Sequence, residues 1–156
     1  MTTKLSEHFM LEELVFSQTA VRKGIANTPE PQHIQNLKAL CENVLERIIG
    51  VIGQRFHINS GYRGPKLNAA IGGAKASKHI EGKAADIVCP AIGTLPLFKA
   101  IVKSDIVFDQ IIFEGTWVHI SYDSAKNRQE ILKATFGNGP VTYTKLSKEK
   151  ALALKQ

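Results

Sequence analysis

Residues 77–86 read SKHIEGKAAD, and residues 117–121 read WVHIS. The first stretch holds His79 at the entry to a predicted strand and Asp86 inside it, and the second places His119 in the middle of another strand. The strand around Asp86, AADIVC at 84–89, is otherwise apolar, so its carboxylate must be paired or coordinated to offset the cost of desolvation. These two stretches therefore predict strands whose polar side chains form specific pairs or bind a ligand.

Metal binding is one task that suits these side chains. Histidine nitrogen and carboxylate oxygen are good zinc ligands, and three protein ligands leave a fourth position to water, as in catalytic zinc sites. His79, Asp86 and His119 are therefore candidate ligands of one zinc ion. The spacing alone is not specific, because a core histidine at 119 and a backbone-bonded carboxylate at 86 also account for these residues. Cys41 and Cys89 lack a CxxC spacing and are expected to be buried free thiols, so a finger-like site is not expected.

The rest of the chain supplies elements on both sides of this stretch. Helical spacing predicts the strongest helix from Pro31 to Gly50–Gly53, with an apolar face at Ile34, Leu37, Cys41, Val44, Leu45 and Ile48. Shorter helices are predicted at 9–16, 66–71, 95–103 and 146–155, and an irregular stretch at 19–31. Strands are predicted at 55–60, 84–89, 107–113, 117–122 and 129–136, with Glu114-Gly115-Thr116 as a hairpin turn. Helices first and then mostly adjacent strands predict an α+β fold, a mostly antiparallel sheet with helices packed on one side.

Length and composition restrict the class of protein. The chain has 156 residues, of which 44% are hydrophobic, and this fits one globular domain spanning 1–156. No apolar run is long enough to span a membrane, and the first residues do not resemble a secretory signal peptide. The net charge of +6 favours anionic polymers such as nucleic acid, anionic lipid or bacterial cell wall. Because no RNA-binding or helix-turn-helix signature is present, nucleic acid is not expected as a partner.

Longer stretches around these motifs resemble a known superfamily. SGYRGPKLNAAIGGAKASKHIEGKAADI at 60–87, followed by FDQIIFEGTWVHIS at 108–121, closely resembles the zinc D-Ala-D-Ala carboxypeptidases and L-alanyl-D-glutamate endopeptidases. That superfamily also includes D-Ala-D-Ala dipeptidases and the hedgehog signalling domain. Its mark is Ser-x-His-x-x-Gly-x-Ala-x-Asp followed by a late Trp-x-His. The opening at 5–31 resembles the phage and bacterial branch, and the resemblance extends over roughly residues 5–135.

The resemblance implies a role for each matching residue. His79, Asp86 and His119 would bind zinc, and Glu114 would be the general base that takes a proton from water and returns it to the leaving amine. Arg63 would bind a substrate carboxylate or steady the developing oxyanion. Ser77 and Trp117 would contact substrate. The same resemblance implies a hedgehog or D-Ala-D-Ala peptidase-like fold.

The assignment of the base depends on local geometry. Residues five apart on an unbroken strand face opposite sides, so Glu114 and His119 can converge only if the chain turns between them. Gly115 and Thr116 supply that interruption. An exposed turn carboxylate is the alternative interpretation of Glu114, a strand-end salt bridge is that of Arg63, and the reserve bases are Asp109 and Asp123.

These observations lead to a functional prediction. We expect a monomeric zinc peptidase that hydrolyses peptidoglycan stem peptides, as a carboxypeptidase or an endopeptidase, and a phage endolysin fits this description. It would be made in the cytoplasm and would reach the cell wall through phage lysis or as part of a virion. The alternative is a non-catalytic zinc-containing domain that binds cell wall or belongs to a virion. Residues 137–156 would form a lysine-rich extension whose removal after 144 leaves zinc binding intact.

Overall fold

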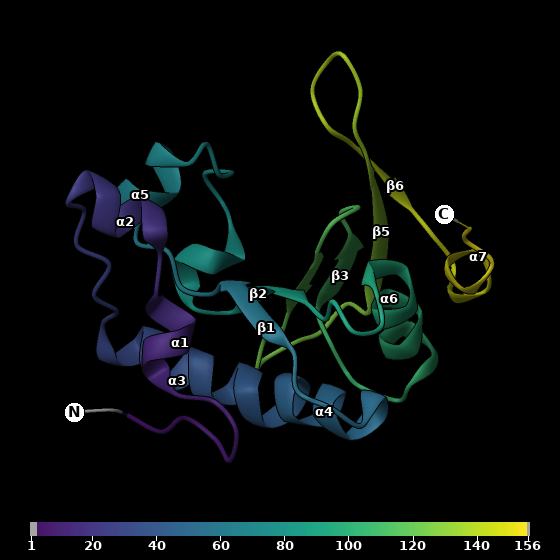
Figure 1. The fold of residues 1–156 in the computed structure, drawn as a ribbon, viewed down its shortest axis with the longest axis horizontal. Helices are drawn as coiled ribbons and strands as arrows, with labels where there is room; N and C mark the ends of the chain where they lie inside the picture. Colours follow the sequence, from purple (N-terminus) through teal and green to yellow (C-terminus); the bar gives the residue numbers. More distant parts are fainter. Residues whose placement is uncertain (1–2, 156) are drawn as a thin grey trace.

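The computed structural model describes residues 3–155 (Figure 1). Met1, Thr2 and Gln156, which belong to the predicted 1–156 domain, lie outside the described residues. The helical elements are α1 (Leu11–Val15), α2 (Gln18–Lys23), α3 (Pro31–Leu40), the π-helical turn η1 (Cys41–Leu45), α4 (Glu46–Ile52), α5 (Pro65–Ala70), the 3-10 turn η2 (Lys78–Glu81), α6 (Thr94–Lys103) and α7 (Lys148–Leu152). The strands are β1 (His57–Ser60), β2 (Ala84–Val88), β3 (Gln110–Phe113), β4 (Val118–Ser121), β5 (Glu130–Thr135) and β6 (Thr142–Lys145).

The predicted α+β class is confirmed, but the sheet is mixed. Its strand order is β1-β2-β4-β3-β5-β6, and β3 pairs with β5 in parallel, whereas the other neighbours are antiparallel. The parallel pair arises because β4 runs antiparallel to β3 and so returns the chain to the end of the sheet at which β3 begins. The chain turns at that end, where the N–H of Gln129 donates to the carbonyl of Phe108. The next strand, β5, therefore runs along β3 in the same direction.

The long helix forms where its sequence predicts it. Pro31 occupies the first turn of α3, where a missing N–H costs nothing, and Gly53 ends α4 in the left-handed region at φ 72°. The π-helical turn η1 lies between them without ending the helix. The predicted apolar face packs into the core, with Ile34 partly buried and the other members fully buried: Leu37, Cys41, Val44, Leu45 and Ile48.

Two elements near the N-terminal and C-terminal ends were not predicted. The stretch expected to be irregular contains α2, which begins after Ser17, whose side chain accepts from the N–H of Ala20, and ends at Gly24 with φ 64°. The C-terminal extension contributes β6, which pairs with β5, and α7, whose Ala151 is fully buried in the core. Residues 142–152 are therefore part of the packed fold, so we expect their removal after 144 to lower the stability of the domain.

Strand register divides the sheet into two faces with different chemistry. One face carries the apolar core that the helices cover, and Figure 1 shows α3 and α4 running along that side; its sheet members are Ala85, Ile87, Ile111, Val118, Ile120 and Ile131. Asp86 pairs with His119 and His119 pairs with Ile112, so these residues share the opposite face. Within the described residues, none of the helices is both long and apolar enough to cross a membrane.

Candidate metal centre

His79 is held by the turn that precedes β2. Ser77 caps η2, its hydroxyl accepting from the N–H of His79 at 3.2 Å, and Gly82 ends the turn at φ 74°. Nδ1 of His79 donates to the carbonyl oxygen of Gly61 at 2.7 Å. Since a carbonyl oxygen only accepts, Nδ1 carries the proton and Nε2 keeps its lone pair. Burial lowers the pKa of His79, which also favours the neutral ring.

The free nitrogen of His79 points toward Asp86. Nε2 of His79 is buried, has no hydrogen-bond partner among the described residues and lies 3.3 Å from Oδ1 of Asp86. A buried unpaired polar atom costs free energy, so such an atom marks a position where a further group is expected. The hydrogen bond from Nδ1 to a backbone carbonyl is the arrangement by which proteins orient metal-binding imidazoles.

Asp86 and His119 meet across the β2–β4 pair. Their Cα atoms are direct partners in the antiparallel register, and Nδ1 of His119 lies 3.1 Å from Oδ1 of Asp86. The burial of Asp86 would raise the pKa of its carboxyl group, but the hydrogen bond with Nδ1 of His119 holds that pKa well below its usual range. Asp86 is therefore a carboxylate, although it lies in an otherwise apolar strand.

The three predicted ligands come together in a geometry that suits a metal ion. One ligand atom from each of His79, Asp86 and His119 lies within 4.8 Å of the other two. Two imidazole nitrogens and one carboxylate oxygen are donors that zinc accepts, and a set of three leaves room for a water molecule. Nε2 of His79 carries a lone pair, has no hydrogen-bond partner among the described residues and lies beside the other two donors, as a metal ligand requires. The residues present therefore fit a zinc ion.

A second cluster of potential ligands lies where the N-terminal segment meets α4. Glu7, His8 and Glu46 also offer donor atoms within 4.8 Å of one another. The carboxylate of Glu46, however, already accepts hydrogen bonds from the Ser6 hydroxyl at 2.6 Å and the His8 backbone at 2.7 Å, and its other oxygen lies 2.6 Å from Nδ1 of His8. These contacts tie residues 6–8 to the long helix and satisfy the carboxylate without a metal.

Glu114 lies at the end of β3 on the same face as the candidate ligands. The turn between β3 and β4 is closed by the N–H of Glu114, which donates to the carbonyl of Trp117 at 3.0 Å, and Gly115 adopts φ 82°. Because Ile112 pairs with His119, Glu114, two residues after Ile112, returns to the face of His119. The turn at Gly115 therefore interrupts the strand, as it must for Glu114 and His119 to lie on the same face.

The side chain of Glu114 is half-buried and held from both sides. Its Oε2 accepts a hydrogen bond from the indole Nε1 of Trp117 at 2.8 Å, and its Oε1 accepts one from the hydroxyl of Tyr143 at 3.5 Å. Burial and the nearby Asp86 carboxylate raise the pKa of Glu114, which outweighs these hydrogen bonds and the attraction of His119. A carboxyl group in this position can accept a proton and return it, which is the role of a general base that later acts as a general acid.

Arg63 is tied to the turn that carries His79. Its backbone N–H donates to the carbonyl of His79 at 3.0 Å, which ties the segment after β1 to η2. Burial lowers the pKa of its guanidinium, whereas Asp86 and Glu114 act in the opposite direction, so both carboxylates lie near the guanidinium. Its Nε is buried and has no hydrogen-bond partner among residues 3–155. The side chain therefore has unused capacity to bind an anionic group.

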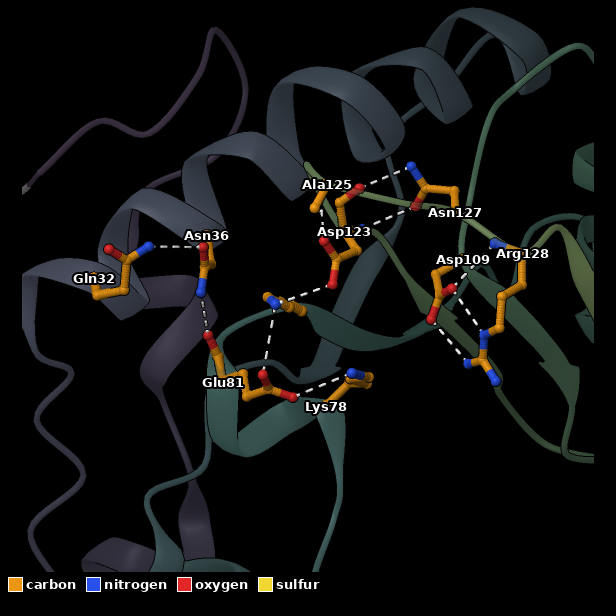
Figure 2. Close-up of polar contacts among 10 residues, drawn as sticks. Gln32, Asn36, Lys78, Glu81, Asp109, Asp123, Ala125, Asn127 and Arg128 are labelled. Atoms are coloured by element: carbon orange, nitrogen blue, oxygen red, sulfur yellow. Dashed lines mark hydrogen bonds and ion pairs between the residues drawn. The ribbon is translucent and has the colours of Figure 1, made fainter.

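The two reserve bases are engaged elsewhere. Asp109 is buried and accepts a bidentate pair of hydrogen bonds from Arg128, both at 2.9 Å (Figure 2). Asp123 accepts from the backbone of Ala125 at 2.8 Å and from Lys83 Nζ at 3.0 Å. Figure 2 shows both carboxylates in separate networks. Glu114 is therefore the carboxylate, apart from Asp86, that faces the candidate ligands in this region.

Two participants were missed from the sequence. Gly61 supplies the carbonyl that orients His79, and a Cβ at that position would collide with the carbonyl oxygen of Leu14. The glycine in SGYR was the available signal. Tyr143 reaches Glu114 from β6, and nothing in its local sequence indicates this, because the contact depends on the pairing of β5 with β6.

Comparison with known proteins agrees with this geometry. A family model described as Peptidase M15 matches residues 7–121, which is more than half of the chain and includes all three candidate ligands, Arg63 and Glu114. A comparison with curated proteins found no match. The family is zinc-dependent and its members are peptidases, so the match suggests a hydrolase. The chain belongs to the Peptidase M15 family, within the zinc D-Ala-D-Ala carboxypeptidase superfamily.

Proposed function

We propose that this chain forms a zinc peptidase domain that hydrolyses peptide bonds in peptidoglycan stem peptides. The observation that carries the proposal is the convergence of His79, Asp86 and His119 within 4.8 Å beside Glu114 and Arg63. Family membership supports the reaction class. A site that only bound zinc would not need a half-buried carboxyl group with a raised pKa next to the ligands.

In this proposal each residue has one task. His79, Asp86 and His119 hold the zinc ion, which when bound supplies Lewis acidity and makes water acidic enough to lose its proton near neutral pH. Glu114 accepts that proton at Oε1 or Oε2 and returns it to the amine that leaves. Its contacts with Trp117 and Tyr143 keep the carboxyl group in one orientation during both transfers.

Arg63 provides the recognition of substrate. Stem peptides of peptidoglycan carry free carboxylates, and the planar guanidinium group binds a carboxylate through two parallel hydrogen bonds. Ser77 caps the turn that carries His79, and Trp117 binds Glu114, so both act on the site through these neighbours in addition to any substrate contact. The net charge of +6 suits an anionic wall.

The proposal is tested with purified protein and peptidoglycan. Sacculi are incubated with the protein, with and without a chelator, and released muropeptides are identified by mass spectrometry. We expect chelator-sensitive release of peptides or amino acids, and the mass of the products distinguishes a carboxypeptidase from an endopeptidase. His119→Ala is expected to abolish release, whereas His57→Ala, at an exposed histidine that is not among the candidate ligands, is the matched control.

Two outcomes would contradict the proposal. Binding of the protein to sacculi without release of any product, in zinc-loaded protein, would favour a non-catalytic wall-binding or virion-associated domain. Release that a chelator does not affect would mean that hydrolysis does not require a metal ion.

A further experiment tests the role in phage lysis. Chelator-sensitive release from intact cell walls of a sensitive bacterium, the substrate of an endolysin, would extend the proposal to phage lysis.

A further inference from the structure

The hairpin formed by β5 and β6 lies beside the candidate site, although it follows the residues that the family model matches. Figure 1 shows the loop between these two strands extending away from the body of the protein. On this hairpin Phe136, Val141 and Tyr143 are exposed, to 53%, 39% and 53% respectively. The ring of Phe136 lies 3.6 Å from the position where Gly115 would carry a Cβ, so the hairpin also contacts the turn that holds Glu114.

Strand register explains how Tyr143 reaches Glu114. Phe113 pairs with Lys133 in the parallel β3–β5 ladder, so the next positions, Glu114 and Ala134, lie side by side. Ala134 in turn pairs with Tyr143 across β5 and β6. The three residues therefore lie in one row on one face of the sheet, and two strand spacings, roughly 9.5 Å, separate the outer two.

Ala134 leaves the space that this contact needs. Its methyl group is small and buried, so the phenol of Tyr143 can pass over it and bring its hydroxyl to 3.5 Å from Oε1 of Glu114. Burial and the neighbouring Glu114 raise the pKa of Tyr143, so the hydroxyl keeps its proton and acts as the donor. Trp117 donates to the other oxygen of the same carboxyl group at 2.8 Å.

We propose that Tyr143 is a positioning residue for Glu114, and that together with Trp117 it fixes the orientation of the carboxyl group in the proposed hydrolysis. The proposal rests on the proposed function for its consequence, but the contact itself does not depend on it. Because Tyr143 lies beyond the matched residues, the hairpin supplies a part of the site that the family motif does not contain.

The test compares two substitutions on the same strand. Tyr143→Phe removes only the hydroxyl that binds Glu114, and Thr144→Val removes a hydroxyl from the adjacent exposed residue, which faces the other side of β6. For zinc-loaded protein acting on muropeptides, Tyr143→Phe is expected to lower kcat by about three- to tenfold with little change in KM, because one exposed hydrogen bond to a carboxylate is lost. Thr144→Val should match the wild type.

A second readout does not require activity. Trp117 is the only tryptophan and its indole binds Glu114, so its fluorescence should follow the protonation of Glu114 as pH is varied. Loss of a donor to the carboxylate raises its pKa, so Tyr143→Phe should move the midpoint to higher pH, and Glu114→Gln should remove the transition. If the wild-type protein cleaves nothing, the proposed function fails while this midpoint still tests Tyr143. Equal kcat and equal midpoints for Tyr143→Phe and wild type, or the same change in Thr144→Val, would overturn the positioning role.

Discussion

Substitution of Glu114 by glutamine separates catalysis from folding and metal binding. The amide oxygen of glutamine can still accept the hydrogen bond that Trp117 donates to Glu114 at 2.8 Å, so the side chain should keep its place. Glutamine cannot take up a proton, so both proposed proton transfers are lost. General acid–base catalysis by one residue contributes about 10²–10⁴-fold, which corresponds to roughly 2.7–5.4 kcal/mol of barrier.

The same substitution should not weaken the fold. Burial and the nearby Asp86 raise the pKa of Glu114, so its negative charge is held at a cost in the folded state. Removal of that charge relieves the cost, and we expect the free energy of unfolding of the metal-free protein to stay within about 1 kcal/mol of wild type or to rise. A loss of activity therefore cannot be attributed to unfolding.

The assay measures cleavage of purified muropeptides by chromatography, together with zinc content and the urea midpoint of each variant. Glu42→Gln, at an exposed position on the long helix, is the matched control and should behave as wild type. In the wild-type enzyme the activity should rise with pH through a pKa above the ordinary value for glutamate, since the base works when ionised. A Glu114→Gln variant within threefold of wild type would refute the assignment of the base.

The remaining predictions concern recognition and stability. Arg63→Ala should keep zinc and fold but raise KM for stem peptides at least about tenfold, as expected for one charge-assisted hydrogen-bonding group, and unchanged kinetics would make Arg63 a structural residue. Asp109→Asn should lower the free energy of unfolding at neutral pH by about 1–2 kcal/mol, because it disrupts the two hydrogen bonds between the buried Asp109 carboxylate and the exposed Arg128. The hydrogen bonds from Arg128 lower the pKa of Asp109 in the folded state. The contribution to stability is therefore present above the unfolded pKa and is lost as pH falls through the folded pKa. A difference in urea midpoint between wild type and Asp109→Asn that is equal at neutral and strongly acid pH would contradict the pairing. Gly82→Ala should destabilise by more than about 1 kcal/mol in thermal unfolding, since φ is 74° and a Cβ would lie 2.7 Å from the carbonyl oxygen of His33. Truncation after residue 144 should cost at least about 2 kcal/mol, because it removes buried Ala151 and the leucines packed around it, and an unchanged urea midpoint would show that α7 contributes nothing.

The convergence of the three candidate ligands was easier to predict from the sequence than the order and direction of the strands. His79, Asp86 and His119 lie in two short motifs, and antiparallel pairing of the two predicted strands is enough to bring Asp86 opposite His119. The hairpin at Gly115 was also predictable, because a glycine turn between two apolar runs is a local signal. These features depend on neighbouring residues or on one strand pair.

The features that could not be predicted depend on contacts between distant segments. The parallel pairing of β3 with β5 is decided by where the chain lies after β4, and no periodicity in residues 129–136 reports it. The contact between Tyr143 and Glu114 requires both the β3–β5 pairing and the β5–β6 pairing. It is therefore harder to predict from the sequence than either pairing alone. The helix α2 is different, since Ser17 and Gly24 are recognisable capping residues and the signal was present in the sequence.

The central claim is that His79, Asp86 and His119 hold one zinc ion, and anomalous diffraction at the zinc edge from crystals grown with zinc tests it most directly. We expect a single strong peak among these three side chains, with Nε2 of His79 and the donor atoms of Asp86 and His119 at about 2.0–2.2 Å from it. Protein crystallised after chelation should lack that peak. Absence of a peak in zinc-grown crystals, or a peak at Glu7, His8 and Glu46 instead, would show that His79, Asp86 and His119 are not the zinc ligands.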